Sequence, residues 1–200
     1  MDRHPYKWDA LHPICGKWAR ASAACRFLHV DSARHRAGAR VAVDDGTTLR
    51  EGPVIAQYLA DRRPDAGLAP AWGTLARYRL MEWLNFLTTE IHKGFIPLLY
   101  AVQAGKYVEP ARRKLDSRFA WIDRQLAGRT FVTGDDALTI ADAYLFALTG
   151  WGKAAWMRSV YNADIDLSRF GNLRGWYERV RARPAVQAVL TADGLGANRS

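Results

Sequence analysis

The chain has 200 residues, 49% of them apolar, and a formal net charge of +9 at pH 7. This length suffices for one large domain or two small ones, and the apolar content suffices to bury a core. No run of about 18 uncharged apolar residues occurs, so we expect no membrane-spanning helix.

The positive charge is concentrated near the start of the chain. Residues 1–42 hold eight Lys/Arg against three Asp/Glu, net +5, whereas residues 43–200 hold 21 against 17, net +4. The sequence shows no basic block and no alternation of basic and aromatic residues, which are the marks of nucleic-acid-binding domains. A nucleic-acid binder is therefore the least favoured alternative, and a steep salt dependence of DNA retention would support it.

Cys15 and Cys25 are the two cysteines of the chain. Two thiols do not form a disulfide framework. The N-terminus lacks the basic region followed by an apolar stretch that marks a signal peptide, so none is predicted. We therefore expect a reduced, cytoplasmic protein.

Regular structure is predicted from about Ala39 onward, since residues 1–38 show no period beyond a short helical pattern at Lys17–Phe27. The segments "ARVAV" and "TTL" flank an Asp-Asp-Gly sequence. They predict a β-hairpin, because Asp-Gly is a favoured two-residue turn.

A helix is predicted to follow from Pro53, which suits the first helical turn because its missing N–H is not needed there. It ends near Pro64, and the segment up to about Trp72 is expected to be a linker. Apolar residues recur on one helical face, at Val54, Ile55, Tyr58 and Leu59.

Every later segment predicts a helix. Gly94 and Pro97 should bend the first of these helices rather than end it. Thr139 and Asp142 match a capping box, a structural feature at the start of an apolar helix that we expect to be buried. The predicted helices are 74–101, 107–127, 139–157, 172–182 and a short one from Pro184 to about Asp193.

One stripe of the helix predicted at 74–101 carries polar residues beside the core stripe. The core stripe is Leu80, Leu84, Leu87 and Ile91, and the stripe beside it is Met81, Asn85, Thr88, His92, Phe95 and Leu99. Such a strip usually faces a groove, a partner or another domain. Periodicity alone favours His92 as an interface histidine and Lys93 as a surface lysine.

Three segments, "DDGTTLREGPVIAQYLAD", "RYRLMEWLNFLTTEIHKGFIPLLY" and "FVTGDDALTIADAYLFAL", resemble the beta-class bacterial glutathione S-transferases, in order from about Ala39 to Leu195. The resemblance implies an α+β fold: a shortened thioredoxin-like glutathione-binding domain at residues 1–66 and an all-helical domain at 72–200. It also implies a homodimer without a metal. Glutathione, as co-substrate, would bind in a cleft between the parts, beside a site for a small apolar electrophile.

The resemblance assigns Glu51 and Gly52 to glutathione binding. They lie where the hairpin passes into a helix, and free amides and the helix dipole there suit the γ-glutamyl carboxylate. The Glu51 carboxylate can pair with the γ-glutamyl ammonium. Many relatives have serine in place of Gly52, so the backbone amide is expected to remain without a hydroxyl contact.

The resemblance also assigns residues of the helical part. His92 and Lys93 match a histidine and a lysine that border the cleft and can stabilise a thiolate. Asn85 matches a position that can reach glutathione in the partner subunit. Trp151 is a candidate for the apolar site, with core packing as an equal alternative.

Residues 1–38 depart from the family pattern and are too few for its opening strand, loop, helix, strand and short helix. The family has a cis-proline before the hairpin, whereas this chain has Ala39, so we expect a trans bond and a changed loop. In this class an N-terminal cysteine lies near the glutathione sulfur. Cys15 is the better candidate for it, and an incidental thiol is the alternative. A shifted reading frame or an incorrect start is a further hypothesis for residues 1–42.

The predicted function is an active glutathione transferase with Cys15 and His92 as catalytic residues. The altered N-terminal region favours an alternative, a transferase-like protein with impaired catalysis that binds apolar ligands or dimerises. Glutathione binding discriminates between the two.

Overall fold

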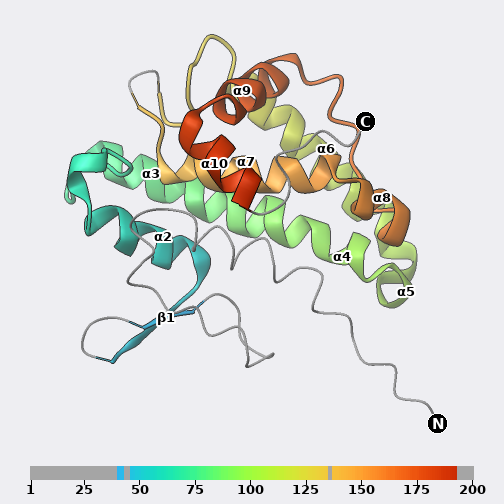
Figure 1. Ribbon diagram of the computed structural model, residues 1–200. Helices are drawn as coiled ribbons and strands as arrows, with labels where there is room; N and C mark the ends of the chain where they lie inside the picture. The colour runs from blue at the N-terminus through green and yellow to red at the C-terminus, as the bar shows by residue number, and fades with distance from the viewer. Residues whose placement is uncertain (1–39, 43–45, 135–136, 193–200) are drawn as a thin grey trace. The chain divides into compact units, whose positions relative to one another are not determined.

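The computed structural model describes residues 40–42, 46–134 and 137–192 (Figure 1). Contacts within the chain divide it into two compact units, of which one is Pro64–Arg181. The described segments of the other unit are 40–42, 46–63 and 182–192. Cys15, Ala39 and the helical pattern at Lys17–Phe27 lie outside the described residues.

The unit that holds residues 40–42, 46–63 and 182–192 is called the first unit, and Pro64–Arg181 is called the second. The first unit contains the predicted hairpin. Strand β1 (Arg40–Ala42) pairs antiparallel with strand β2 (Thr48–Arg50), and Ala42 lies opposite Thr48. This register leaves an odd number of residues between paired positions. The predicted Asp-Gly turn includes Asp45, which lies outside the described residues. Gly46 nevertheless has a φ of +81°, a conformation that glycine adopts without steric cost.

Helix α2 (Gly52–Asp61) follows the hairpin, as predicted, with Pro53 in its first turn. Ile55 and Ala60 form its buried positions. Helix α10 (Pro184–Ala192) belongs to the same unit, and its start at Pro184 also matches the prediction.

The second unit begins with a short 3₁₀ turn, η3 (Pro64–Ala66), and the long helical segment predicted at 74–101. Its α-helical part, α3 (Leu75–Phe86), passes into a π-helical turn, η4 (Leu87–His92), and a 3₁₀ turn, η5 (Lys93–Phe95). Helix α4 (Ile96–Leu99) continues to Tyr100, where the backbone leaves the helical conformation. The chain thus remains helical across Gly94 and Pro97, but regular α-helix ends earlier, at Phe86.

Two threonine hydroxyl groups bond to the backbone where the helix changes at Leu87. The Thr88 hydroxyl donates to the Leu84 carbonyl at 2.8 Å, and the Thr89 hydroxyl donates to the Asn85 carbonyl at 3.0 Å. Hydroxyl groups that bond to carbonyls four residues earlier compete with the backbone ladder. The Lys93 amide donates to Thr88, five residues earlier, which is the spacing of a π turn.

Two helices and a 3₁₀ turn come next in the second unit. Helix α5 (Ala101–Ala104) and the 3₁₀ turn η6 (Gly105–Tyr107) lead into helix α6 (Val108–Gln125). The apolar face of α6 is buried, as are the residues of the predicted core stripe in α3 and η4. The fully buried side chains include Leu80, Leu84, Leu87, Ile91, Leu115, Phe119 and Ile122.

Helix α7 (Ile140–Lys153) is buried along most of its length, as predicted, but it is shorter than the predicted 139–157. Ala154 is extended, with ψ of 131°, and a separate helix α8 (Ala155–Tyr161) follows. Gly150 and Gly152 weaken the last turn of α7, since glycine is a poor helix former. The Gly152 carbonyl accepts from the Ile165 amide at 3.2 Å.

The predicted capping box at the start of α7 is confirmed, and Asp142 does more than cap the helix. Its fully buried carboxylate accepts from the Thr139 amide at 2.9 Å and from the Thr139 hydroxyl at 3.1 Å. It also accepts from the Val132 amide and from Trp176 Nε1, both at 2.9 Å. Because Trp176 lies on helix α9 (Gly171–Arg181), this carboxylate ties α7 to α9 and to the loop after α6.

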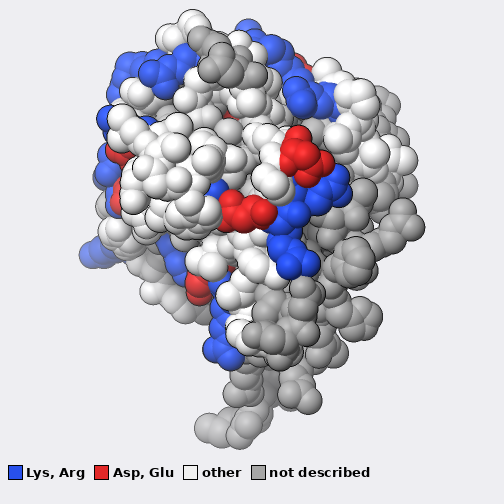
Figure 2. All heavy atoms as spheres, turned by 90° about the vertical axis from the view of Figure 1, so that its left-hand side faces the viewer, with Lys and Arg blue, Asp and Glu red and all other residues white. Residues whose placement is uncertain are grey.

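In the part of the chain that the structure describes, no helix combines the length and hydropathy needed to cross a membrane. Figure 2 shows one face of the molecule, on which basic and acidic side chains are interspersed with uncharged surface.

Candidate functional site

His92 ends the π turn η4 and lies against helix α7. Its Nδ1 is 2.7 Å from Tyr144 Oη, and its ring meets the Trp151 ring edge to face, with centroids 5.0 Å apart and planes at 81°. Tyr144 and Trp151 are seven residues apart on α7, so they share a face of that helix. His92 itself is half-buried. Sequence analysis missed Tyr144, because its role depends on which helix lies beside η4.

Trp151 is a buried residue with 5% of its surface exposed. Besides His92 it packs against Phe95, at 6.0 Å between ring centroids. Its indole Nε1 is buried and has no hydrogen-bond partner among the described residues. Trp151 is therefore packed in the core, which is one of the two alternatives from the sequence. Its ring also contacts one side of the His92 ring.

Asn85 and Lys93 are both exposed on the long helical segment. His92 and Thr88 of the same predicted strip are half-buried, but Phe95 and Leu99, which the 3.6-residue period placed on that strip, are core residues. The polar strip therefore ends near His92. The π turn explains the difference, because it shifts the phase of every later residue.

Glu51 and Gly52 lie in the first unit, at the junction of β2 and α2. Glu51 has a φ of +68°, which is uncommon for a residue with a side chain. Its carbonyl accepts from the Val54 and Ile55 amides, both at 3.0 Å, so the turn is fixed by the helix itself. Both residues are exposed, and a Cβ added to Gly52 would meet no atom of the described residues within 4 Å.

The predicted site residues therefore form two groups. Asn85, His92, Lys93 and Trp151 belong to the second unit, and Glu51 and Gly52 belong to the first. Cys15 lies outside the described residues. Among the described residues there is no group of three or more His, Cys, Asp or Glu side chains suited to a metal ion.

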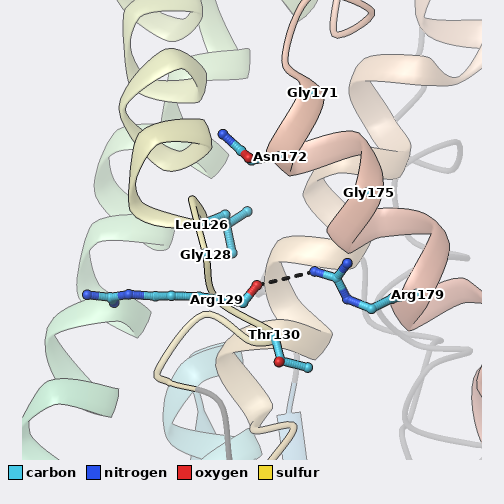
Figure 3. Close-up of a pocket in the computed structure, with 8 residues that line it drawn as sticks. All are labelled: Leu126, Gly128, Arg129, Thr130, Gly171, Asn172, Gly175 and Arg179. Atoms are coloured by element: carbon cyan, nitrogen blue, oxygen red, sulfur yellow. Dashed lines mark hydrogen bonds between the residues drawn. The ribbon is translucent and has the colours of Figure 1, made fainter.

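A surface pocket of about 410 Å³ lies elsewhere in the second unit, between the loop after α6 and the start of α9 (Figure 3). Arg179 donates to the Arg129 carbonyl at 3.3 Å across it. At the start of α9, Asp123 accepts from the Leu173 amide at 2.8 Å and from the Asn172 side chain at 3.3 Å. These three hydrogen bonds join α6 and the loop after it to α9. The pocket is lined by Leu126, Gly128, Arg129, Thr130, Gly171, Asn172, Gly175 and Arg179.

Comparison with known proteins identifies the family. Residues 101–179 match the family model described as the C-terminal domain of glutathione S-transferase. The glutathione S-transferase GstA of Escherichia coli O157:H7 is 36% identical over 153 residues, which cover 76% of this chain and 72% of that protein. The chain belongs to the glutathione S-transferase family. A Xanthomonas campestris glutathione S-transferase, GST-4.5, is 32% identical over 160 residues, covering 76% and 74% of the two chains.

Solved structures place this glutathione S-transferase among the bacterial beta class. BphK, a bacterial glutathione S-transferase solved as a ternary complex, is 41% identical, with a TM-score of 0.70 over 78% of this chain and 74% of that one. The beta-class enzyme of Sphingomonas chungbukensis is 30% identical, with a TM-score of 0.72 over 92% of both chains. A sphingomonad glutathione S-transferase complexed with glutathione is also 30% identical, with a TM-score of 0.73 over 93% and 94%. The α+β fold class predicted from the sequence is confirmed.

Proposed function

We propose that this chain conjugates the thiol of glutathione to small apolar electrophiles. The observation that carries the proposal is the likeness, over 93% of the chain, to a sphingomonad glutathione S-transferase that was solved with glutathione bound. Glutathione is the co-substrate. In the reaction its thiol loses a proton, the sulfur forms a bond to an electrophilic carbon, and the leaving group departs with its electron pair.

His92 and Lys93 are the residues we assign to the glutathione sulfur. A hydrogen-bond donor and an ammonium group beside a sulfur favour its anionic form, which is the nucleophile. The half-buried position of His92 supports this role, because a charge interaction is stronger where water is partly excluded. Cys15 remains the proposed cysteine near this sulfur.

Glu51 and Gly52 are assigned to the γ-glutamyl end of glutathione. The exposed Glu51 carboxylate is available to pair with the ammonium group, and the Gly52 amide to donate to the carboxylate. The Glu51 backbone supports this assignment, since uncommon conformations of this kind concentrate at ligand sites.

The remaining parts of the proposal follow from the family. We assign the glutathione-binding domain to residues 1–66 and the helical domain to 72–200, and we place the protein in the cytoplasm as a homodimer. Asn85 is the residue through which one subunit reaches the glutathione of its partner, and its exposure on α3 suits that contact. Trp151 is proposed to line the electrophile site through its contact with His92.

A second candidate is a transferase-like protein that has lost turnover. Two observations favour it: residues 1–38 depart from the family pattern, and Ala39 stands where the family has a cis-proline. The two candidates differ in turnover and not in fold.

Steady-state conjugation of glutathione to a chlorinated aromatic electrophile tests the proposal. We expect turnover above the uncatalysed rate. We also expect His92→Ala to lower kcat/KM about tenfold or more while the thermal unfolding midpoint changes little, because a lost transition-state donor costs about this factor. Unchanged kcat/KM in that variant would remove His92 from the reaction, and a folded wild type without turnover would favour the second candidate.

A further inference from the structure

The contact between Tyr144 and His92 assigns a role to a residue outside the predicted site. The two side chains are 52 positions apart in the sequence, and Tyr144 Oη lies 2.7 Å from His92 Nδ1. This distance lies within the range of a hydrogen bond. It joins the end of η4 to the second turn of α7.

The chemistry of the two groups decides which of them donates. A neutral imidazole has one N–H donor and one bare nitrogen that accepts, and the hydrogen bond made by one nitrogen fixes the tautomer. A phenol ordinarily has a pKa of about 10 and is fully protonated at neutral pH, while the imidazole nitrogen is the stronger base of the pair. The stronger arrangement is therefore phenol O–H to bare Nδ1.

We propose that Tyr144 is a positioning residue that donates to Nδ1 of His92 and thereby keeps the imidazole hydrogen on Nε2. The neutral ring then presents an N–H donor on the side away from Tyr144. The consequence for catalysis rests on the proposed function: His92 can donate to the glutathione sulfur without first being charged.

The surroundings hold both partners in place. The Trp151 ring meets the His92 ring at 5.0 Å, and Trp151 is buried, so the imidazole is confined on that side as well. Two residues before Tyr144, the buried Asp142 carboxylate accepts four hydrogen bonds at the start of α7. The helix that carries Tyr144 is thus anchored close to it, and positional precision of this kind is what an oriented donor requires.

The charged groups near His92 leave this assignment intact. Glu90, two residues earlier, is already paired with Lys114 at 3.1 Å and with Arg118 at 2.7 Å, both on α6. Lys93 follows His92 and is exposed. On α7, Asp142 is committed to the capping box.

Nuclear magnetic resonance of the full chain labelled with ¹⁵N-histidine tests the tautomer directly. The His92 signals are assigned by their loss in His92→Gln. We expect wild-type His92 near neutral pH to show a bare Nδ1 and a protonated Nε2, and Tyr144→Phe to show a mixture of tautomers. The matched control Tyr177→Phe removes a hydroxyl from α9, on a ring that stacks on Phe146, and should leave the His92 signals unchanged. A protonated Nδ1 in the wild type, or an unchanged tautomer in Tyr144→Phe, would overturn the proposal.

Kinetics then separates positioning from structural support. Tyr144→Phe should lower kcat/KM about two- to tenfold, the range that one hydrogen bond supplies. In the His92→Ala background the same substitution should have no further effect, because Tyr144 acts through His92. An equal loss in both backgrounds would contradict positioning. If the wild type has no turnover at all, the proposed function fails, while the tautomer measurement still decides the Tyr144 assignment.

Discussion

Asp142 is one residue that connects three segments of the second unit. Its carboxylate is fully buried and accepts from two backbone amides, a hydroxyl and an indole N–H. A buried donor that loses its acceptor is desolvated without a hydrogen bond to compensate, which lowers the free energy of unfolding. The residue therefore matters more for folding than a helix cap alone would.

Replacing this carboxylate should destabilise the protein strongly. We expect Asp142→Ala to lower the free energy of unfolding by about 3–5 kcal/mol, because it strands several buried donors. Thr139→Ala removes only one capping hydroxyl and should cost about 1 kcal/mol. Urea unfolding followed by circular dichroism measures both. Equal midpoints for the two variants would show that the bonds to Val132 and Trp176 contribute nothing.

At the residue scale the sequence revealed the capping box but not its additional partners. The Thr139–Asp142 spacing is local, so it can be recognised without knowing the fold. The bonds to Val132 and Trp176 reach 10 and 34 positions along the chain, and no short pattern records them. Tyr144 was missed for the same reason, since 52 positions separate it from His92.

Among the elements, the long helix that carries the site is the informative case. Its boundaries were predicted closely, because apolar residues recur at helical spacing from Leu80 to Ile91. Its π turn was not predicted, and the phase shift it introduces places Phe95 in the core. The break at Ala154 was also missed, since the apolar pattern of α7 continues past it.

Close packing of this helix against α6 leads to a prediction at Gly94. A Cβ at Gly94 would lie 2.9 Å from Leu115 Cδ1, a buried methyl group. Gly94→Ala should therefore lower the free energy of unfolding by about 1–2 kcal/mol, since overpacking outweighs the gain in helix propensity. Gly175→Ala is the matched control. Within the described part of the chain its Cβ would approach only Arg179, at 3.9 Å, so this change should stabilise α9 by up to about 1 kcal/mol. Thermal unfolding compares the two, and a rise in midpoint for Gly94→Ala would refute the packing argument.

Ion pairs from Glu90 to Lys114 and Arg118 connect the π turn η4 to α6, and their contribution to stability depends on pH. Hydrogen bonds from Arg118 and Lys114 hold the pKa of Glu90 below its ordinary value of 4.5. A carboxylate whose pKa is lower in the folded state contributes stability that is fully present above the unfolded pKa and is lost as the pH falls through the folded pKa.

The difference in unfolding free energy between wild type and Glu90→Gln should therefore be constant near neutral pH, at about 0.5–1 kcal/mol for a partly exposed cluster. It should shrink toward zero as the pH falls below about 4. Urea titrations at a series of pH values measure it. A difference that persists in strong acid would mean that Glu90 acts through packing instead of charge.

At the scale of the whole molecule, family membership is secure and the fold class was predictable from the sequence. The hairpin, α2 and the helical part follow local patterns, and the similar structures extend over most of the chain. Of the proposed site residues, Glu51 and Gly52 belong to one unit, and Asn85, His92, Lys93 and Trp151 belong to the other. Local sequence patterns identify each of these groups.

The most direct test of the account is a calorimetric titration of the purified protein with glutathione. The account predicts saturable binding at one site per subunit, weakened about tenfold or more in Glu51→Ala, because removing one partner of a charge pair costs at least this factor. A wild-type protein that unfolds cooperatively but shows no saturable binding would contradict the proposed transferase function. Equal affinity in wild type and Glu51→Ala would contradict the assignment of Glu51.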